Sequence, residues 1–161
     1  MAPAWTALAN ITLGSAASSV TFSSISGLYK DLHLVITGKG SSSPGVYIRF
    51  NSDSGSNYAN IWATGYAGSM YSGSNTTTQI YGNYNLPMDT TVTSIVTTDV
   101  LDYSATNKHK STLTRFSGAA YGVEMLAGRW INTAAITSLS ITASSGTFAA
   151  GSTFALYGVS A

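Results

Sequence analysis

The stretch Asp31-Leu32-His33-Leu34-Val35-Ile36-Thr37 decides the fold class. Leu32, Leu34 and Ile36 fall on one face of an extended chain, because successive side chains of a strand point to opposite sides. The segment 38–45, GKGSSSPG, is dense in turn residues and must be a loop. The stretch therefore predicts a β-strand with one face in a core, followed by a turn.

The same alternation recurs in short segments that are separated by Gly, Ser, Asn and Pro. It predicts strands at 5–13, 20–22, 46–50, 91–103, 108–117, 122–126, 136–143 and 153–159, with a short candidate at 78–81. In the opening strand, one face would carry Trp5, Ala7, Ala9, Ile11 and Leu13. Eight or nine strands without a crossover helix predict an all-β fold, an antiparallel β-sandwich of jelly-roll type.

Composition supports the same fold class. The chain of 161 residues contains 25 Ser and 21 Thr but one Glu and one Gln, and only 8% of its residues are charged. Helix surfaces are normally rich in Glu, Gln, Lys and Arg, whereas Thr, Tyr and Val favour strands. We expect a single domain over residues 1–161, with a loop-rich Tyr/Gly/Ser/Asn region at about 51–90, where alternation weakens.

Charge and hydropathy limit the partners that we expect. A formal net charge of +1 argues against a nucleic-acid partner, and no apolar run is long enough for a membrane span. The first residues do not have the pattern of a secretory signal. Cysteine is absent, which removes disulfides, thiolate nucleophiles and cysteine-ligated metals.

Catalytic and metal motifs are weak. His33 is expected to face outward on a strand, His109 flanks a hairpin, and none of the six carboxylates lies in a recognisable motif. The segment 51–57, NSDSGSN, has the oxygen-rich look of a calcium loop but lacks the closing Glu, so an Asx-rich turn is the better interpretation. The sequence therefore predicts a protein that is not an enzyme and has no cofactor and no metal site.

The densest basic group is Lys108, His109, Lys110 and Arg115. We expect charges on a surface or edge strand there, with a surface for an anionic partner as the alternative. A hairpin centred on Ala105 would place Asp102 opposite Lys108.

Aromatic residues gather in the weakly patterned region: Tyr58, Trp62, Tyr66, Tyr71, Tyr81 and Tyr84. Rings with a polar tip suit protein interfaces and stacking against sugars, and they also fill small cores beneath long loops. Both interpretations stay open. Tyr58, Trp62, Tyr66 and Tyr71 are the candidate interface or ligand-binding residues.

Three parts of the chain together resemble a recurring pattern in virion surface proteins of tailed bacteriophages. These parts are ITLGSAASSVTFSSI at 11–25 with LYKDL at 28–32, FNSDSGSNY at 50–58, and GRWINTAAITSL at 128–139 followed by Phe148, Gly151-Ser152 and LYGV at 156–159. The resemblance implies a structural β-sandwich without agreed catalytic residues.

Two roles follow from this resemblance. One is a capsid decoration (cement) protein, which stabilises the head shell, contacts the major capsid protein and self-associates, with a trimer favoured. The alternative is a tail-fibre or receptor-binding tip that recognises host surface glycan. A small chain without a shaft favours the first role. The expected location is the capsid surface of a virion, after synthesis in the cytoplasm of a bacterial host.

Overall fold

The computed structural model describes residues 4–118 and 122–160. In these ranges the chain forms twelve strands and no helix, and no element could cross a membrane as a helix. The strands are β1 (Trp5–Thr12), β2 (Ser19–Phe22), β3 (Asp31–Gly38), β4 (Val46–Phe50), β5 (Tyr58–Tyr66), β6 (Ser69–Thr77), β7 (Ile80–Tyr81), β8 (Ser94–Leu101), β9 (Lys110–Gly118), β10 (Gly122–Trp130), β11 (Leu139–Ala143) and β12 (Thr153–Val159).

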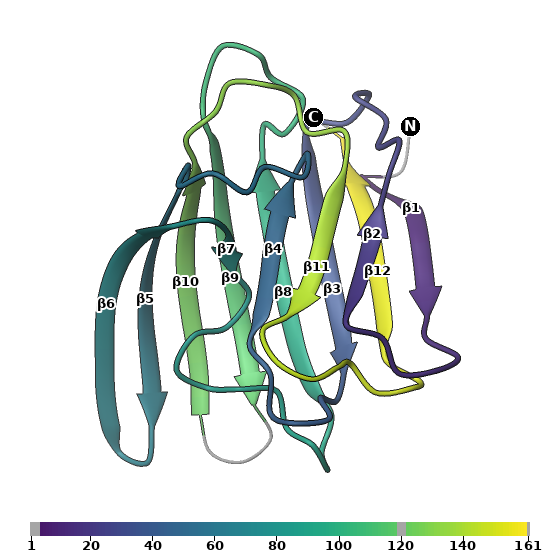
Figure 1. Cartoon of the computed structure of the whole chain (residues 1–161). Coiled ribbons are helices and arrows are strands. Elements are labelled where there is room, and N and C mark those ends of the chain that lie inside the picture. Colours follow the sequence, from purple (N-terminus) through teal and green to yellow (C-terminus); the bar gives the residue numbers. More distant parts are fainter. Residues whose placement is uncertain (1–3, 119–121, 161) are drawn as a thin grey trace.

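The strands form two antiparallel sheets that face each other. The larger sheet has eight strands in the order β1-β12-β3-β8-β9-β10-β5-β6, and the smaller has four in the order β2-β11-β4-β7. Figure 1 shows the smaller sheet in front of the larger one, with β5 and β6 at one edge, beyond β7. This arrangement confirms the predicted antiparallel β-sandwich of jelly-roll type, with twelve strands in place of eight or nine.

The main core lies between the two sheets. Leu32, Leu34 and Ile36 of β3 are fully buried, as their alternation predicts, and they pack with Ile48 and Phe50 of β4. The prediction for 153–159 coincides with β12. Burial of this kind supplies the main driving force for folding, because apolar surface leaves water.

A β-bulge corrects the predicted face of the first strand. Ala7 pairs with Tyr157 and Ala9 pairs with Leu156, so Leu8 is an extra residue between them. A bulge of this kind shifts the side-chain alternation by one residue. Trp5 and Ala7 consequently lie on the opposite face from Ala9, and the Trp5 ring contacts His33 on the outer side of the larger sheet at 4.6 Å.

The expected loop-rich region at 51–90 is wrong for residues 58–77, which form two nine-residue strands. β5 pairs along its whole length with β10 and with β6. Neither face of this hairpin is uniformly apolar: the inner face of β5 mixes Tyr58 with Asn60 and Thr64, and the outer face carries Ile61. Backbone pairing therefore forms strands here without the alternation by which strands are recognised.

Candidate functional site

The structure distributes the four candidate residues over three environments. Alternation along β5 places Tyr58, Trp62 and Tyr66 on the inner face of the larger sheet. Tyr71 of β6 pairs with Thr64 and shares that face. Position along the strand then decides the surroundings, because the smaller sheet covers only part of the larger one.

Tyr58 lies in the main core and offers no face to a partner. Its ring stacks on Trp130 with a centroid separation of 6.4 Å, and the Phe50 N–H donates to its hydroxyl at 3.1 Å. Burial raises the pKa of Tyr58 to about 12. The structure therefore separates Tyr58 from the other three candidates and gives it a packing role.

Trp62 belongs to a small aromatic cluster under the segment 78–89. Its ring centroid lies 3.8 Å from that of Tyr84 and 6.4 Å from that of Tyr81. The opposite residue on β6 is Gly73, where a Cβ atom would lie only 2.5 Å from the indole Cζ2. Most of the Trp62 side chain is thus covered from within the chain, as in the prediction of a small core beneath a loop.

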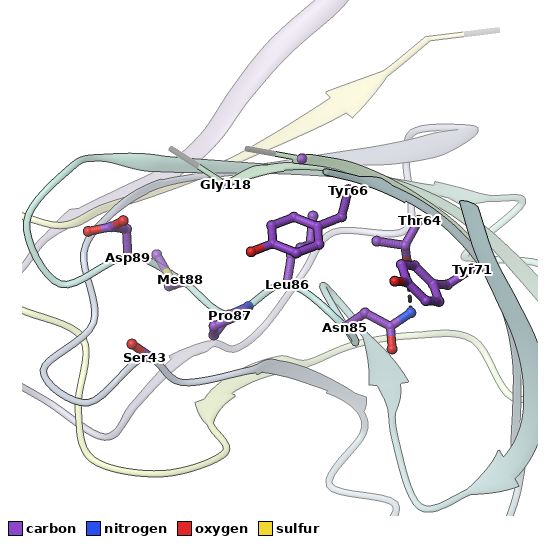
Figure 2. Close-up of a pocket in the computed structure, with 11 residues that line it drawn as sticks. Ser43, Thr64, Tyr66, Tyr71, Asn85, Leu86, Pro87, Met88, Asp89 and Gly118 are labelled. Carbon is purple, nitrogen blue, oxygen red and sulfur yellow. Dashed lines mark hydrogen bonds between the residues drawn. The ribbon is translucent and has the colours of Figure 1, made fainter. Parts of the chain in front are cut away.

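Tyr66 and Tyr71 line an open groove of about 490 Å³ between the β5–β6 hairpin and the segment 85–89. Figure 2 shows the Tyr66 ring above Leu86 and the Tyr71 ring near Thr64 and Asn85. The two tyrosines remain 40% and 52% exposed. These two candidates are therefore the ones whose rings can meet a ligand.

Glu124, the one glutamate of the chain, fixes the wall of this groove. Its buried carboxyl group accepts hydrogen bonds from Thr64 Oγ1 (2.6 Å), the Tyr84 N–H (2.7 Å) and the Asn85 N–H (2.9 Å). Asn85 Nδ2 in turn donates to Thr64 Oγ1 at 2.8 Å. The sequence alone did not predict a role for Glu124 or Asn85. The one Glu of a chain with so few charges could have marked Glu124 as a residue with a specific partner.

A second surface lies on the opposite side of the same strands. We call it the outer apolar face, and it carries large side chains that are between 41% and 75% exposed: Ile61, Met70, Leu113, Val123 and Met125. Strand register brings them together, since Ala127 pairs with both Ile61 and Leu113, and Met125 pairs with Ala63. Two shallow hollows of about 470 and 460 Å³ lie on this face. Contiguous apolar surface of this kind marks interaction sites.

The basic group does not lie on an edge strand, although Lys108, His109 and Arg115 are on the surface as expected. β9 lies inside the larger sheet, between β8 and β10. Lys110 is fully buried, and its Nζ donates to the carbonyl oxygens of Ala105, Lys108 and Thr133 at 2.7 to 3.1 Å. Desolvation by burial lowers the pKa of Lys110. Lys108 and Asp102 are in contact as predicted, at 3.0 Å, but the hairpin is centred on Thr106 and not on Ala105, since Leu101 pairs with Ser111.

His33 points to the outer side of its sheet, as expected, but it is largely buried there. Its Nδ1 lies 2.5 Å from Asp99 Oδ1, and Arg115 Nη2 lies 3.7 Å from Asp99 Oδ2. Trp5 and Tyr157 cover the imidazole. In the described part of the chain, the His33 side chain makes its hydrogen bond with the Asp99 carboxylate and not with a serine hydroxyl.

The segment 51–57 forms an Asx-rich turn, as predicted. Asn51 and Ser52 adopt positive φ angles of 51° and 57°. The Asp53 carboxylate accepts hydrogen bonds from Trp130 Nε1 (2.7 Å), Asn57 Nδ2 and the Gly55 N–H. Burial acts to raise the pKa of Asp53, and these hydrogen bonds together lower it below its ordinary value. Within the described ranges, no three His, Asp or Glu side chains gather as metal ligands.

These observations define an antiparallel jelly-roll β-sandwich whose larger sheet carries an aromatic groove on one side and the outer apolar face on the other. No family model and no curated protein matches the chain.

Among solved structures, the chain is similar to the marine PL-14 alginate lyase from Aplysia kurodai, with 10% identity, a TM-score of 0.45, and coverage of 93% of this chain and 79% of that one. Alginate lyase Aly36B matches with 10% identity, a TM-score of 0.39 and coverage of 93% and 77%. The galectin LEC-6 of Caenorhabditis elegans matches with 9% identity, a TM-score of 0.37 and coverage of 94% and 96%. Similarity at this level does not assign a function.

Proposed function

We propose that the protein is a structural subunit that docks on other proteins through its outer apolar face. In line with the resemblance in its sequence, we assign it to the capsid surface of a tailed bacteriophage, as a decoration (cement) protein. The observation that carries this proposal is the cluster of Ile61, Met70, Leu113, Val123 and Met125, which lie side by side and exposed on one sheet face.

The chemistry of this face supports protein docking. β5 and β6 contain no charged residue, whereas Arg115, which pairs with Met125, and Arg129 lie on the outer side of β9 and β10. A partner can therefore cover the β5–β6 part of the face without desolvating ions. Burial of apolar area contributes roughly 25 cal/mol per Å² before the cost of ordering is subtracted. The hollows beside Ile61 and Met125 offer places for side chains of the partner. In the proposed role the partners are the major capsid protein and further copies of this chain, arranged as a trimer.

Copy number in intact virions tests the location. Electron microscopy of particles should show hundreds of copies over the head shell. A handful of copies at the tail would contradict the decoration role and support a receptor-binding tip instead.

Substitutions on the outer apolar face test the docking surface. A charge at its centre, in Met125→Glu, should reduce binding to capsids that lack the protein by at least tenfold, which corresponds to about 1.4 kcal/mol or more. Leu28→Glu is the matched control, because Leu28 is 89% exposed and lies in the segment between β2 and β3, outside this face. Equal binding by wild type and Met125→Glu would exclude this face as the docking surface.

A further inference from the structure

The groove beside Tyr66 and Tyr71 has features of a ligand site that the docking role does not use. It opens on the inner side of the β5–β6 hairpin, whereas the outer apolar face lies on the other side of the same strands. Alternation makes the two sides independent: Met70 points outward and Tyr71, the next residue, points into the groove. A ligand in the groove would therefore leave the docking face free.

The two tyrosines offer ring faces to one ligand. Tyr66 pairs with Ser69, and Thr64 pairs with Tyr71, so the tyrosines are diagonal neighbours on the hairpin. Such neighbours lie roughly 7–8 Å apart, within reach of a single extended molecule. Figure 2 shows both rings on the same side of the hairpin, above the segment that carries Asn85 and Leu86. Aromatic faces of this kind stack against the C–H faces of sugar rings.

Asn85 supplies fixed hydrogen-bonding groups at the same place. Its backbone N–H donates to Glu124, and one N–H of its side-chain amide donates to Thr64, so both ends of the residue are anchored to the groove wall. The second amide N–H and Oδ1 make no hydrogen bond with the described residues. One donor and one acceptor on this anchored amide match a pair of neighbouring hydroxyl groups.

The charge of the groove lining disfavours acidic saccharides. Its described lining includes Asp89 but no Lys, Arg or His. Hydrogen bonds from the Val92 and Thr91 N–H groups lower the pKa of Asp89, so its carboxylate stays ionised near neutral pH. An anionic sugar would meet a negative charge without a compensating cation, and a neutral sugar would not.

We propose that the groove between Tyr66, Tyr71 and Asn85 binds a neutral oligosaccharide, with the tyrosines stacking on sugar rings and the Asn85 amide bonding to hydroxyl groups. This inference does not rest on the docking role.

Calorimetric titration with neutral hexasaccharides of glucose, galactose and mannose tests the site, with an alginate hexasaccharide as the acidic comparison. At least one neutral hexasaccharide should bind saturably at concentrations up to about 10 mM, and the alginate hexasaccharide should not. Tyr71→Ala and Tyr66→Ala should each weaken that binding about tenfold or more, while their exposed positions leave the melting temperature nearly unchanged.

Met70→Ala is the matched control, because it alters the adjacent residue on the opposite face. It should keep saccharide binding within about twofold of wild type. The proposal is overturned if none of the three neutral hexasaccharides binds, if the alginate hexasaccharide binds as tightly, or if both tyrosine variants bind like wild type. Each of these results leaves the Met125→Glu docking experiment unaffected, so the two proposals fail separately.

Discussion

The two halves of the larger sheet have differently constructed inner faces. On β12 and β3, the inner side chains are apolar and belong to the main core, and on β8 Val96 and Val100 join them beside the buried Thr98. On β6 and on β5 beyond Tyr58, the cover is the segment 78–89, which is attached through hydrogen bonds from Asn60 to Gln79 and from the Tyr84 N–H to Glu124. The first half is a closed core. In the second half, polar contacts hold the covering segment in place, and a groove remains open beside it.

The largest expected effect contrasts Trp130, which lies in the closed core, with Trp62, which lies beside Tyr81 and Tyr84 of the segment 78–89. Trp130→Ala should cost about 3–5 kcal/mol in the free energy of unfolding, because the buried ring leaves a cavity and Asp53 loses its indole partner. Trp62→Ala should cost less, about 1–2 kcal/mol, since its ring is only partly buried. Urea denaturation of both variants measures the difference. Equal losses would mean that the 78–89 cover belongs energetically to the main core.

A smaller effect is expected at Glu124, which connects the cover to β10. Glu124→Ala removes the acceptor of three hydrogen bonds and should cost about 2–3 kcal/mol. The bonded groups lie in the covering segment, so amide hydrogen exchange under native conditions should become faster at Tyr84 and Asn85. Exchange at the amides of β3 should change little. Uniform acceleration over the whole chain would contradict the distinction between the two halves.

The smallest expected effect is a loss of stability at acidic pH, through Asp53 in the turn before β5. The pKa of Asp53 is lower in the folded chain than its ordinary value of 3.8. A lowered folded pKa contributes stability that is complete above the unfolded value and is lost as pH falls through the folded value. Melting temperatures of wild type should therefore converge on those of Asp53→Asn as pH falls from 5 toward 2. A constant difference over that range would exclude this contribution of Asp53.

The strands of the core half could be predicted from the sequence, because apolar residues alternate along them and the apolar side is the buried one. β3, β4 and β12 appear in the sequence with nearly their observed bounds. β5 and β6 could not be predicted in this way, since their inner side chains are polar or aromatic and their outer ones include exposed apolar residues. The bulge at Leu8 is likewise invisible, because its cause is the pairing with β12 and not the local composition.

The candidate site was predictable only in part. The aromatic set was found by composition, yet the sequence does not say that Tyr58 lies beneath the smaller sheet while Tyr66 and Tyr71 lie beyond it. That distinction depends on how far β7 and the segment 78–89 extend across β10 and β5, which is a property of tertiary packing. The outer apolar face could have been detected from Val123, Met125 and Ala127, which alternate with the inward residues of β10.

The burial of Lys110 has a consequence for chemical labelling. Amine-reactive reagents need access to the nitrogen, and the Lys110 amine is enclosed by three carbonyl oxygens, unlike that of Lys108 a few residues away. Acylation of Lys110 therefore requires the chain to open around β9, whereas acylation of Lys108 does not. Within one molecule, the ratio of Lys110 to Lys108 acylation, measured by mass spectrometry, therefore reports how often the chain opens around β9.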